Sequence, residues 1–500
     1  MLGLTGTEKR PLGLKWRSSV WFVTLVVGNG IATDLLVYSI IIPVVPFQLE
    51  KLGYSNVSGR TGWLLFAYSA GLSVSTPVVA HLSEIYRSRW WPMMFGLFAL
   101  IGSNVMFMEA PNYWVMVIAR IFQSVSSSAV WVVGLALLRD TTPEQKIGRQ
   151  LGLALSSISI GFVIAPPIGG ALYDHFGFRA PFIFGIICAA VEGFGRSLVI
   201  ERRDALKWGH DPAAELTGNQ SGNQEKSARS TDSATRNTNS AGQDRPSPTD
   251  PVSAPPISAT GEPEDTSRSS PVTAQPNVHL GPLQVLLALS KSSRALASVL
   301  NIFIYGMVFV GLDPTLPLRL QSTWNFNPGR VGWAYVASGV PPIFSSPLTG
   351  WYIDRHGTAW MTPLSLLLSL PWWLVLIVRW HVALFIASFA VANFFMAGVV
   401  SALTAELAAV ARTIPGIGFA HVFGAFNFAY GIGSGVGPLL SGQIYDHVRQ
   451  GWVAVCSITA SAVFVATIVS FCYIGERPLI KRVLHFKAQR REAIEPSAFA

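Results

Sequence analysis

The sequence predicts an all-α integral membrane protein with twelve transmembrane helices in two pseudo-symmetric six-helix bundles. Half of its 500 residues are apolar and only 13% are charged, against about 25% in soluble domains. Mean hydropathy is +0.42. The apolar residues fall into stretches of roughly 20, the length that crosses a bilayer as a helix. Several short phrases of the first half also recur in the second half at nearly one separation.

The apolar stretches form two sets of six. The first set lies near 20–45, 61–82, 92–109, 113–138, 150–172 and 181–199. The second set lies near 294–316, 331–352, 361–379, 383–409, 420–442 and 452–474. The first stretch is longer than the apolar region of a cleavable signal peptide, so we interpret it as a retained span.

Between the two sets, the composition changes sharply. The run SGNQEKSARSTDSATRNTNSAGQDRPSPTD has almost nothing apolar to bury. Such a segment cannot offset the entropy lost on folding, and we predict that it is disordered. The chain therefore divides into a cytoplasmic N-terminus (1–19), an N-terminal bundle (20–199), a disordered cytoplasmic linker (200–292), a C-terminal bundle (293–474) and a cytoplasmic C-terminus (475–500).

The positive charges orient the spans. Lys and Arg near the spans are about three times as frequent on one face of the membrane as on the other, which places both termini in the cytoplasm. The net charge of +9 therefore reflects membrane orientation and does not indicate nucleic-acid binding. On the outer face, Asn56 opens an Asn-Val-Ser sequon and is a candidate glycosylation site.

Several classes of protein do not fit this sequence. Cys188, Cys456 and Cys472 all lie in apolar stretches, which argues against a disulfide framework and a zinc site. The sequence shows no nucleophile–base pair, metal-ligand cluster or nucleotide-binding loop. We therefore expect no enzymatic activity, no metal and no cofactor.

The clearest repeat is a glycine-proline phrase in the fifth span of each half. The first copy comprises Gly152, Gly161, Ala165, Pro166, Gly169 and Gly170, followed by Tyr173-Asp174-His175. The second comprises Gly424, Gly433, Gly437, Pro438, Ser441 and Gly442, followed by Tyr445-Asp446-His447. The glycines permit close helix packing, and the proline bends the span.

Two further repeats have nearly the same separation. Gly59 and Gly329 open the second and eighth spans. At the other ends of these spans, Ala80-x3-Glu84 matches Gly350-x3-Asp354. The chain is therefore a duplicated six-helix unit, and duplicated halves place a binding site at their interface near the membrane midplane.

Asp34 is an acid in the middle of the first span. A carboxylate there is unfavourable by roughly 2.5–3.5 kcal/mol, so it persists where it is paired or useful. Removal from water favours the protonated form, and a cationic substrate favours the ionised form. Competition between proton and substrate for one site is a sufficient physical basis for exchange. The structural alternative is a cap or hydrogen-bonding role with Asn29 or Thr33.

These motifs resemble the major facilitator superfamily, specifically its twelve-span drug:proton antiporter branch. The phrase around Pro166 looks like the antiporter signature of that branch, with Ala165 replacing one glycine. Arg120-x2-Gln123 in the fourth span looks like its second signature, and Asp34-x8-Pro43-Val44-Val45-Pro46 has the spacing of vesicular amine transporters and their fungal relatives. Gly350-x3-Asp354-Arg355-x-Gly357 looks like the loop motif of the superfamily, whereas Ala80, Glu84 and Arg87 depart from it in the first half.

The resemblance implies the major facilitator fold and roles for other charged residues. Arg120 and Gln123 share one helix face. The resemblance implies that the arginine assists proton movement. The alternative is that it forms an ion pair that locks the fourth span. Glu192 and Arg196 are four residues apart and form a structural charge pair. Glu84, Arg87, Arg89, Asp354 and Arg355 are expected to act as a cytoplasmic latch.

Four polar residues are candidates for the central cavity. Asn427 and Tyr430 are three residues apart in the eleventh span, and Asn301 and Tyr305 are four apart in the seventh. Amine transporters tend to have an aspartate where Asn427 stands, which weakens the case for an amine substrate and gives Asp34 less help in coupling.

The function that follows is proton-coupled export of amphiphilic small molecules such as drugs, toxins or secondary metabolites. The alternatives are a facilitator or symporter of a small polar nutrient, and a non-transporting membrane sensor that signals through its linker. The partners expected are the lipid bilayer, the substrate and protons, with no nucleic acid, and the protein is expected to be a monomer. We place it in the plasma membrane, with a vacuolar or vesicular membrane as the alternative.

Overall fold

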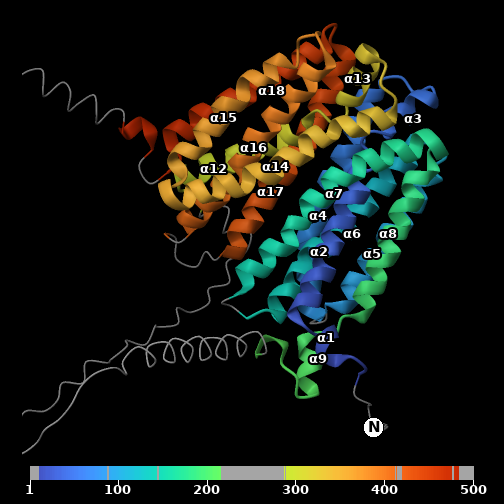
Figure 1. Ribbon diagram of the computed structural model, residues 1–500, viewed down its shortest axis with the longest axis vertical. Helices are drawn as coiled ribbons and strands as arrows, with labels where there is room; N and C mark the ends of the chain where they lie inside the picture. The colour runs from blue at the N-terminus through green and yellow to red at the C-terminus, as the bar shows by residue number, and fades with distance from the viewer. Residues whose placement is uncertain are drawn as a thin grey trace, which may run out of the picture. The chain divides into compact units, whose positions relative to one another are not determined.

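The computed structural model describes residues 11–86, 89–143, 146–214, 287, 289–411, 413, 419–475 and 478–482 (Figure 1). These residues are helical and contain no strand, which confirms the predicted fold class. Six long helices belong to the first half: α2 (Val20–Ser39), α4 (Val57–Tyr86), α5 (Trp90–Met108), α6 (Tyr113–Thr141), α7 (Ile147–Phe176) and α8 (Arg179–Leu198). Six belong to the second half: α12 (Ser293–Gly311), α14 (Pro328–His356), α15 (Thr358–Val375), α16 (Val382–Ala411), α17 (Phe419–His447) and α18 (Gly451–Tyr473).

Length and composition make most of these helices suitable for crossing a membrane. Within the described residues, ten helical segments are apolar enough to do so. The two long helices that fall short are α14 and α17, which are rich in glycine, proline and serine. These two helices lie between the halves, where small residues serve close packing.

The same helix pairs pack in both halves. In the first half α2 packs against α7, α4 against α6, and α5 against α6 and α8. The equivalent pairs in the second half are α12 with α17, α14 with α16, and α15 with α16 and α18. The duplication in the sequence is therefore also a duplication of packing.

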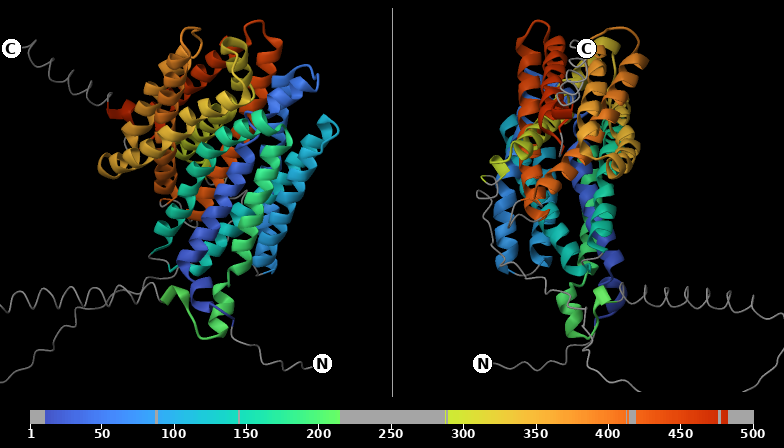
Figure 2. Two further views of the ribbon diagram at one scale, coloured as in Figure 1. Left: turned by 45° about the vertical axis from the view of Figure 1, so that its right-hand side comes forward. Right: turned by 90° about the vertical axis from the view of Figure 1, so that its left-hand side faces the viewer.

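The halves meet along two helix pairs. Helix α4 runs along α17, and α7 runs along α14 (Figures 1 and 2). Helix α2 packs against α7, and α12 packs against α17, so the first helix of each half lies next to one of the helices at the interface.

The first helix of each half ends at a proline-containing turn. After α2 the chain turns and continues as the short helix α3 (Val45–Lys51), and after α12 it turns and continues as α13 (Leu316–Trp324). Pro43 and Pro46 at the first turn correspond to Pro314 and Pro317 at the second. Proline ends a helix because it lacks the backbone donor and clashes with the preceding turn.

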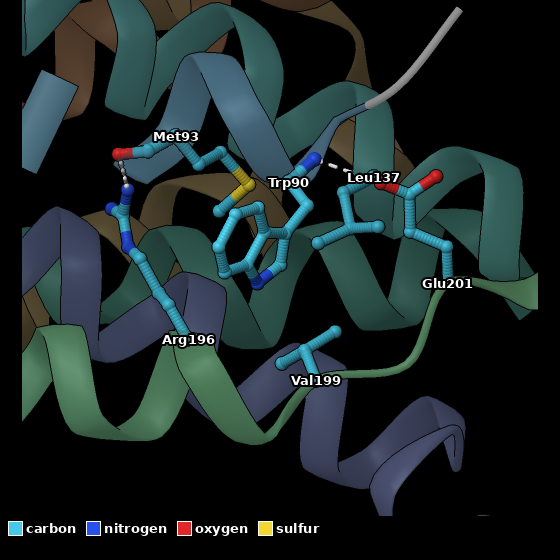
Figure 3. Close-up of a pocket in the computed structure, with 6 residues that line it drawn as sticks. All are labelled: Trp90, Met93, Leu137, Arg196, Val199 and Glu201. Atoms are coloured by element: carbon cyan, nitrogen blue, oxygen red, sulfur yellow. Dashed lines mark hydrogen bonds between the residues drawn. The ribbon is translucent and has the colours of Figure 1, made fainter. Parts of the chain in front are cut away.

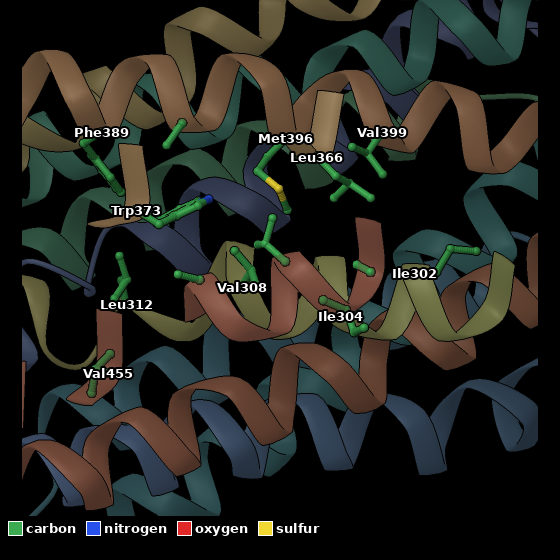
Figure 4. Packing of buried hydrophobic residues seen from close by; sticks show 14 of the residues in the cluster. Ile302, Ile304, Val308, Leu312, Leu366, Trp373, Phe389, Met396, Val399 and Val455 are labelled. Atoms are coloured by element: carbon green, nitrogen blue, oxygen red, sulfur yellow. The ribbon is translucent and has the colours of Figure 1, made fainter. Parts of the chain in front are cut away.

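The largest hydrophobic core lies in the second half and continues into the first. Val308, Trp373, Phe389 and Val455 pack together from α12, α15, α16 and α18 (Figure 4). The same cluster includes residues of the first half: Tyr38 of α2, Ile42 in the turn after it, and Leu65 and Tyr68 of α4. The two halves therefore share apolar contacts.

The linker begins later than we predicted. Residues 200–214 were expected to be disordered, but they are ordered and include the short helix α9 (Arg202–Lys207). The carboxylate of Glu201 accepts hydrogen bonds of 2.8 Å from the backbone N–H groups of Arg89 and Trp90, which open α5. Arg202 makes two 2.9 Å hydrogen bonds with Asp211. At the other end of the predicted linker, residues 287 and 289–292 are also described, with residues 287, 289 and 290 helical. The disorder predicted for residues 215–286 and 288 lies outside the described residues.

Candidate functional site

Two aspartates join the halves at one end of the bundles. At the end of α7, Asp174 accepts a 2.9 Å hydrogen bond from the backbone N–H of Gly329, in the first turn of α14. At the end of α17, Asp446 accepts a 2.6 Å hydrogen bond from the backbone N–H of Gly59, in the first turn of α4. Free N–H groups and the helix dipole make a helix N-terminus a favourable place for a carboxylate. The repeated phrases therefore bind each other, each aspartate to the glycine of the opposite half.

Close backbone contacts surround these hydrogen bonds. A Cβ on Gly170 would overlap the carbonyl of Pro328, and a Cβ on Gly442 would overlap that of Ser58. Further along, Gly332 of α14 meets the carbonyl of Pro166. The end of the bundles that we predict to be outside is therefore tightly closed.

The opposite end of the same helices is open. A Cβ added to Gly152 of α7, Gly350 of α14 or Gly424 of α17 would meet no atom within 4 Å. These glycines lie toward the ends that we predict to be cytoplasmic. The close backbone contacts between the halves are therefore concentrated at one end, and these three glycines lie away from them.

Asp34 lies in α2 and is fully buried. Its Oδ2 accepts a 2.6 Å hydrogen bond from Ser127 and a 3.0 Å hydrogen bond from the indole of Trp131, both on α6. Ser127 in turn bonds the hydroxyl of Tyr68 on α4 at 2.8 Å. The Oδ1 atom has no hydrogen-bond partner within the described part of the chain. The carboxylate therefore points into the first bundle and away from lipid, with one oxygen free.

Arg120 is buried beside aromatic rings. It donates a 2.9 Å hydrogen bond to Gln123, and its guanidinium lies 5.6 Å from the ring of Tyr38, 5.9 Å from that of Tyr68 and 5.6 Å from that of Phe107. Among the described residues, no carboxylate forms an ion pair with Arg120. The alternative of an ion pair locking the fourth span is therefore wrong, and the rings take the place of a counter-ion.

A chain of aromatic rings crosses from one half to the other. Its successive members, with centroids 4.7 to 6.4 Å apart, are Tyr68, Tyr38, Phe162, Phe309, Tyr305, Tyr430 and Phe426. The step between the halves is the contact of Phe162 on α7 with Phe309 on α12, at 5.8 Å. This aromatic chain begins next to Arg120 and next to Ser127, the hydrogen-bond donor of Asp34.

A cavity lies beside the step between the halves. Phe162, Pro166, Phe309, Asp313 and Tyr335 are among the residues that line it. Asp313 follows α12 at the turn into α13 and is largely buried. The lining is mainly aromatic and aliphatic with few polar groups.

Glu192 and Arg196 form the predicted ion pair within α8, and both are buried. Arg196 also donates a 3.1 Å hydrogen bond to the carbonyl of Met93 on α5. Figure 3 shows this arginine reaching Met93 at a small pocket that Trp90 and Glu201 also line. The pair therefore connects α8 to α5, and it also contacts α2 at Gly30.

The four other cavity candidates separate into different environments. Tyr305 and Tyr430 belong to the aromatic chain. Asn301 instead donates to the carbonyl of Ala297 and accepts a 3.0 Å hydrogen bond from Ser470 of α18. Because this side chain is occupied within the second bundle, we exclude it from the cavity.

The side chain of Asn427 is exposed. It precedes Gly431 and Ser434 by four and seven residues, and these contact Ser73 and Ser69 of α4. Residues at this spacing share a helix face. Asn427 therefore lies on the face of α17 that turns toward α4, nearer the open end than the contacts between the two helices.

The glycines of the α7 phrase contact two different helices. Gly161 and Gly169 meet the backbone of α2 at Ala32 and Ile40. Gly170 meets α14 in the other half, and Gly152 lies in open space. Pro166 lies inside α7. The phrase thus packs α7 against α2 in its own bundle and against α14 across the interface.

Two members of the predicted cytoplasmic latch, Arg89 and Arg355, contact residues of their own half. Arg89 forms a 3.0 Å ion pair with Asp140 in its own half, and Arg355 lies over the ring of Trp351 in its own helix. The side chains of Glu84 and Asp354, and all of Arg87, lie outside the described residues. Asn56 is exposed in the turn before α4, with a positive φ of 55°.

Sequence reasoning missed the partners of Asp34 and the role of the two aspartates. Ser127 and Trp131 belong to a helix far away in sequence, and no pattern within α2 points to them. Asp174 and Asp446 carried a usable signal, because each is repeated together with the glycine that its counterpart binds.

Comparisons with known proteins give one family. The family model of the Major Facilitator Superfamily matches residues 27–269 and 298–499. An MFS-type transporter, ppzB, of Metarhizium rileyi is 27% identical over 93% of this chain and 97% of its own length. A probable vesicular acetylcholine transporter-B of Danio rerio is 33% identical over 38% of this chain and 40% of its own.

Solved structures share the fold at low sequence identity. A bacterial homologue of the human lysosomal transporter Spinster superposes with a TM-score of 0.64 at 12% identity, over 92% of this chain and 98% of that one. A D-xylose–proton symporter has the same TM-score and identity, over 91% of this chain and 98% of the symporter.

Proposed function

The chain belongs to the Major Facilitator Superfamily of membrane transporters, and from that premise we propose that it is a proton-coupled antiporter that exports amphiphilic small molecules. It works by alternating access: the two bundles rock around a central site that opens to one side of the membrane at a time. The site lies along the aromatic chain between the halves, and Asp34 is its proton-binding group.

The position of Asp34 is the observation that carries this proposal. The acid is fully buried and keeps one oxygen without a partner. Through Ser127 and Tyr68 it is linked to the first ring of the aromatic chain. A carboxylate in such a place is favoured when it holds either a proton or the positive charge of a substrate. The two therefore exclude each other, and their exchange couples opposite fluxes.

The aromatic chain supports an amphiphilic substrate. Its rings come from α2, α4 and α7 of one half and from α12 and α17 of the other. An apolar body binds such rings by dispersion and burial, and a cationic group binds their faces. A site built from both halves also changes shape when the halves move, as release on the other side requires.

One relative and one residue bear on the substrate. The partial match to a vesicular acetylcholine transporter supports a positively charged cargo facing Asp34. The uncharged, exposed Asn427 argues for a site that relies more on rings than on acids. We place the protein in the plasma membrane with both termini in the cytoplasm, and a vesicular membrane is the alternative.

The proposal is tested with purified protein in acid-loaded proteoliposomes containing a pH-sensitive dye. A panel of amphiphilic cations is added outside one compound at a time. Antiport predicts that an active compound enters while protons leave. A symporter would carry both in one direction, which would contradict the proposal. A sensor would move neither, and shortening the linker between 215 and 286 would abolish its output while leaving a transporter's flux intact.

A further inference from the structure

The ion pair of α8 is pressed against the helix that carries Asp34. A Cβ on Gly30 of α2 would lie 2.7 Å from Oε1 of Glu192 and 2.7 Å from a guanidinium nitrogen of Arg196. Glycine at this position is therefore what lets the pair reach the backbone of α2. Both side chains are buried, at 0% and 2% exposure.

Asp34 lies one turn along α2 from Gly30. Residues four apart share a helix face, and side chains lean toward the helix N-terminus. The carboxylate of Asp34 therefore leans toward the place where the guanidinium of Arg196 meets Gly30. Asp34 and the ion pair of Glu192 with Arg196 therefore lie against neighbouring turns of α2. Oδ1 of Asp34 and Oε2 of Glu192 have no hydrogen-bond partner within the described residues.

We propose that Asp34, Glu192 and Arg196 form one proton-binding unit in which Arg196 is the counter-ion shared by two carboxyl groups. With one proton bound, the unit holds one carboxylate and one guanidinium and is neutral. When the proton leaves for water, the unit carries one negative charge, and a cationic substrate beside Asp34 balances it. This assignment rests on the proposed proton coupling through Asp34. It adds Glu192 and Arg196 of α8 as positioning residues that act through Asp34.

The helices packed around Asp34, Glu192 and Arg196 contribute few other ionisable side chains near them. Helix α5 carries no ionisable side chain, and α7 carries them only near its ends. Helix α6 contributes Arg120 next to the aromatic rings, besides the uncharged donors to Asp34. Helix α4 contributes Tyr68 through its bond to Ser127. Within α2 itself, Tyr38 lies one turn beyond Asp34.

A purely structural pair would behave differently. Glu192 and Arg196 could neutralise each other and only fasten α8 to α5 through the carbonyl of Met93. Removing both charges would then leave the proton affinity of Asp34 unchanged. If Arg196 is shared, each change of charge at α8 alters the pH at which Asp34 takes up its proton.

The test is an infrared titration of protonated carboxyl groups in the full-length protein in lipid nanodiscs, without substrate. In Glu192→Gln, Asp34 is the only carboxyl group of the unit that faces Arg196, so the guanidinium stabilises its ionised form. The midpoint of Asp34 protonation should therefore move at least about one pH unit lower. In the double variant Glu192→Gln/Arg196→Gln, Asp34 loses its positive neighbour and the midpoint moves higher. Asp34→Asn removes the signal of Asp34 and identifies it.

A matched control replaces the exposed pair of Glu109 and Arg179, which are 2.6 Å apart on the surface. The variant Glu109→Gln/Arg179→Gln should titrate like the unmodified protein. Shifts of opposite sign in the single and double α8 variants support the shared counter-ion. A double variant that titrates like the control overturns it, even where proton-driven transport through Asp34 is found. The titration needs no substrate, so its result can be interpreted even if the transport assay fails.

Discussion

The carboxylate of Asp446, at the end of α17, accepts a hydrogen bond from the backbone N–H of Gly59, at the start of α4. Asp174 and Gly329 form the same bond between α7 and α14. Each bond joins the two halves, and both lie at the end where the helices are in backbone contact. The pseudo-symmetry of the chain thus produces two equivalent bonds between the halves at the end that we predict to be outside.

Replacing these aspartates should favour opening of the outer end. In Asp446→Asn a charge-assisted bond to a helix N-terminus becomes a weaker neutral one, a loss of about 1 kcal/mol. That corresponds to about a fivefold change in the ratio of closed to open protein. Double electron–electron resonance between spin labels at the exposed positions Phe176 and Arg330 should show a larger fraction of long distances.

The double variant Asp174→Asn/Asp446→Asn should shift the ratio about twice as far in free energy, because the two bonds lie on separate helix pairs. Glu109→Gln, which breaks an exposed pair within one half, is the control. Unchanged distance distributions in the double variant would show that these bonds do not hold the outer end.

A methyl group at the tight glycines should block closure. In Gly170→Ala the new Cβ would overlap the backbone carbonyl of Pro328, which cannot move away alone. The same change at Gly152, in open space at the other end of α7, causes no clash in this state and gains about 1 kcal/mol of helix propensity.

We expect Gly170→Ala to lower the closed fraction in the same spin-label measurement and to slow transport. Gly152→Ala should leave the closed fraction at the outer end unchanged. Equal effects of the two substitutions would contradict the assignment of closed and open ends.

The ring at the step between the halves should contribute to substrate affinity. Phe162 meets both Tyr38 and Phe309, so Phe162→Ala interrupts the aromatic chain. The substrate would lose one aromatic contact, which corresponds to about 1 kcal/mol. The KM for an exported aromatic cation should therefore rise about fivefold. Phe95→Ala, on the exposed face of α5, is the matched control and should keep its KM.

Much of the fold could be predicted from sequence, because membrane spans depend on local composition. All twelve expected spans correspond to long helices, and the glycine-proline repeat predicted the duplication. The helix around Arg202 was missed because the hydrogen bonds of Glu201 with the start of α5, and of Arg202 with Asp211, cannot be read from local composition.

The site was only partly accessible to sequence reasoning. An acid within an apolar stretch is a local property of the sequence, and it made Asp34 a candidate that the structure shows to be buried. The rotation of each helix about its axis depends on packing, so the bond of Asn301 to Ser470 and the contact of Phe162 with Phe309 could not be foreseen. The same limit hid the approach of Arg196 to α2 at Gly30.

The most direct measurement of the central claim compares the unmodified protein with Asp34→Asn in acid-loaded proteoliposomes, using an amphiphilic cation that the unmodified protein exchanges for protons. The asparagine keeps the shape and hydrogen-bonding capacity of the side chain but cannot bind a proton. We predict that the variant reconstitutes normally yet releases no protons and accumulates no cation when the gradient is imposed. Proton-driven accumulation at the unmodified rate by Asp34→Asn would contradict the account.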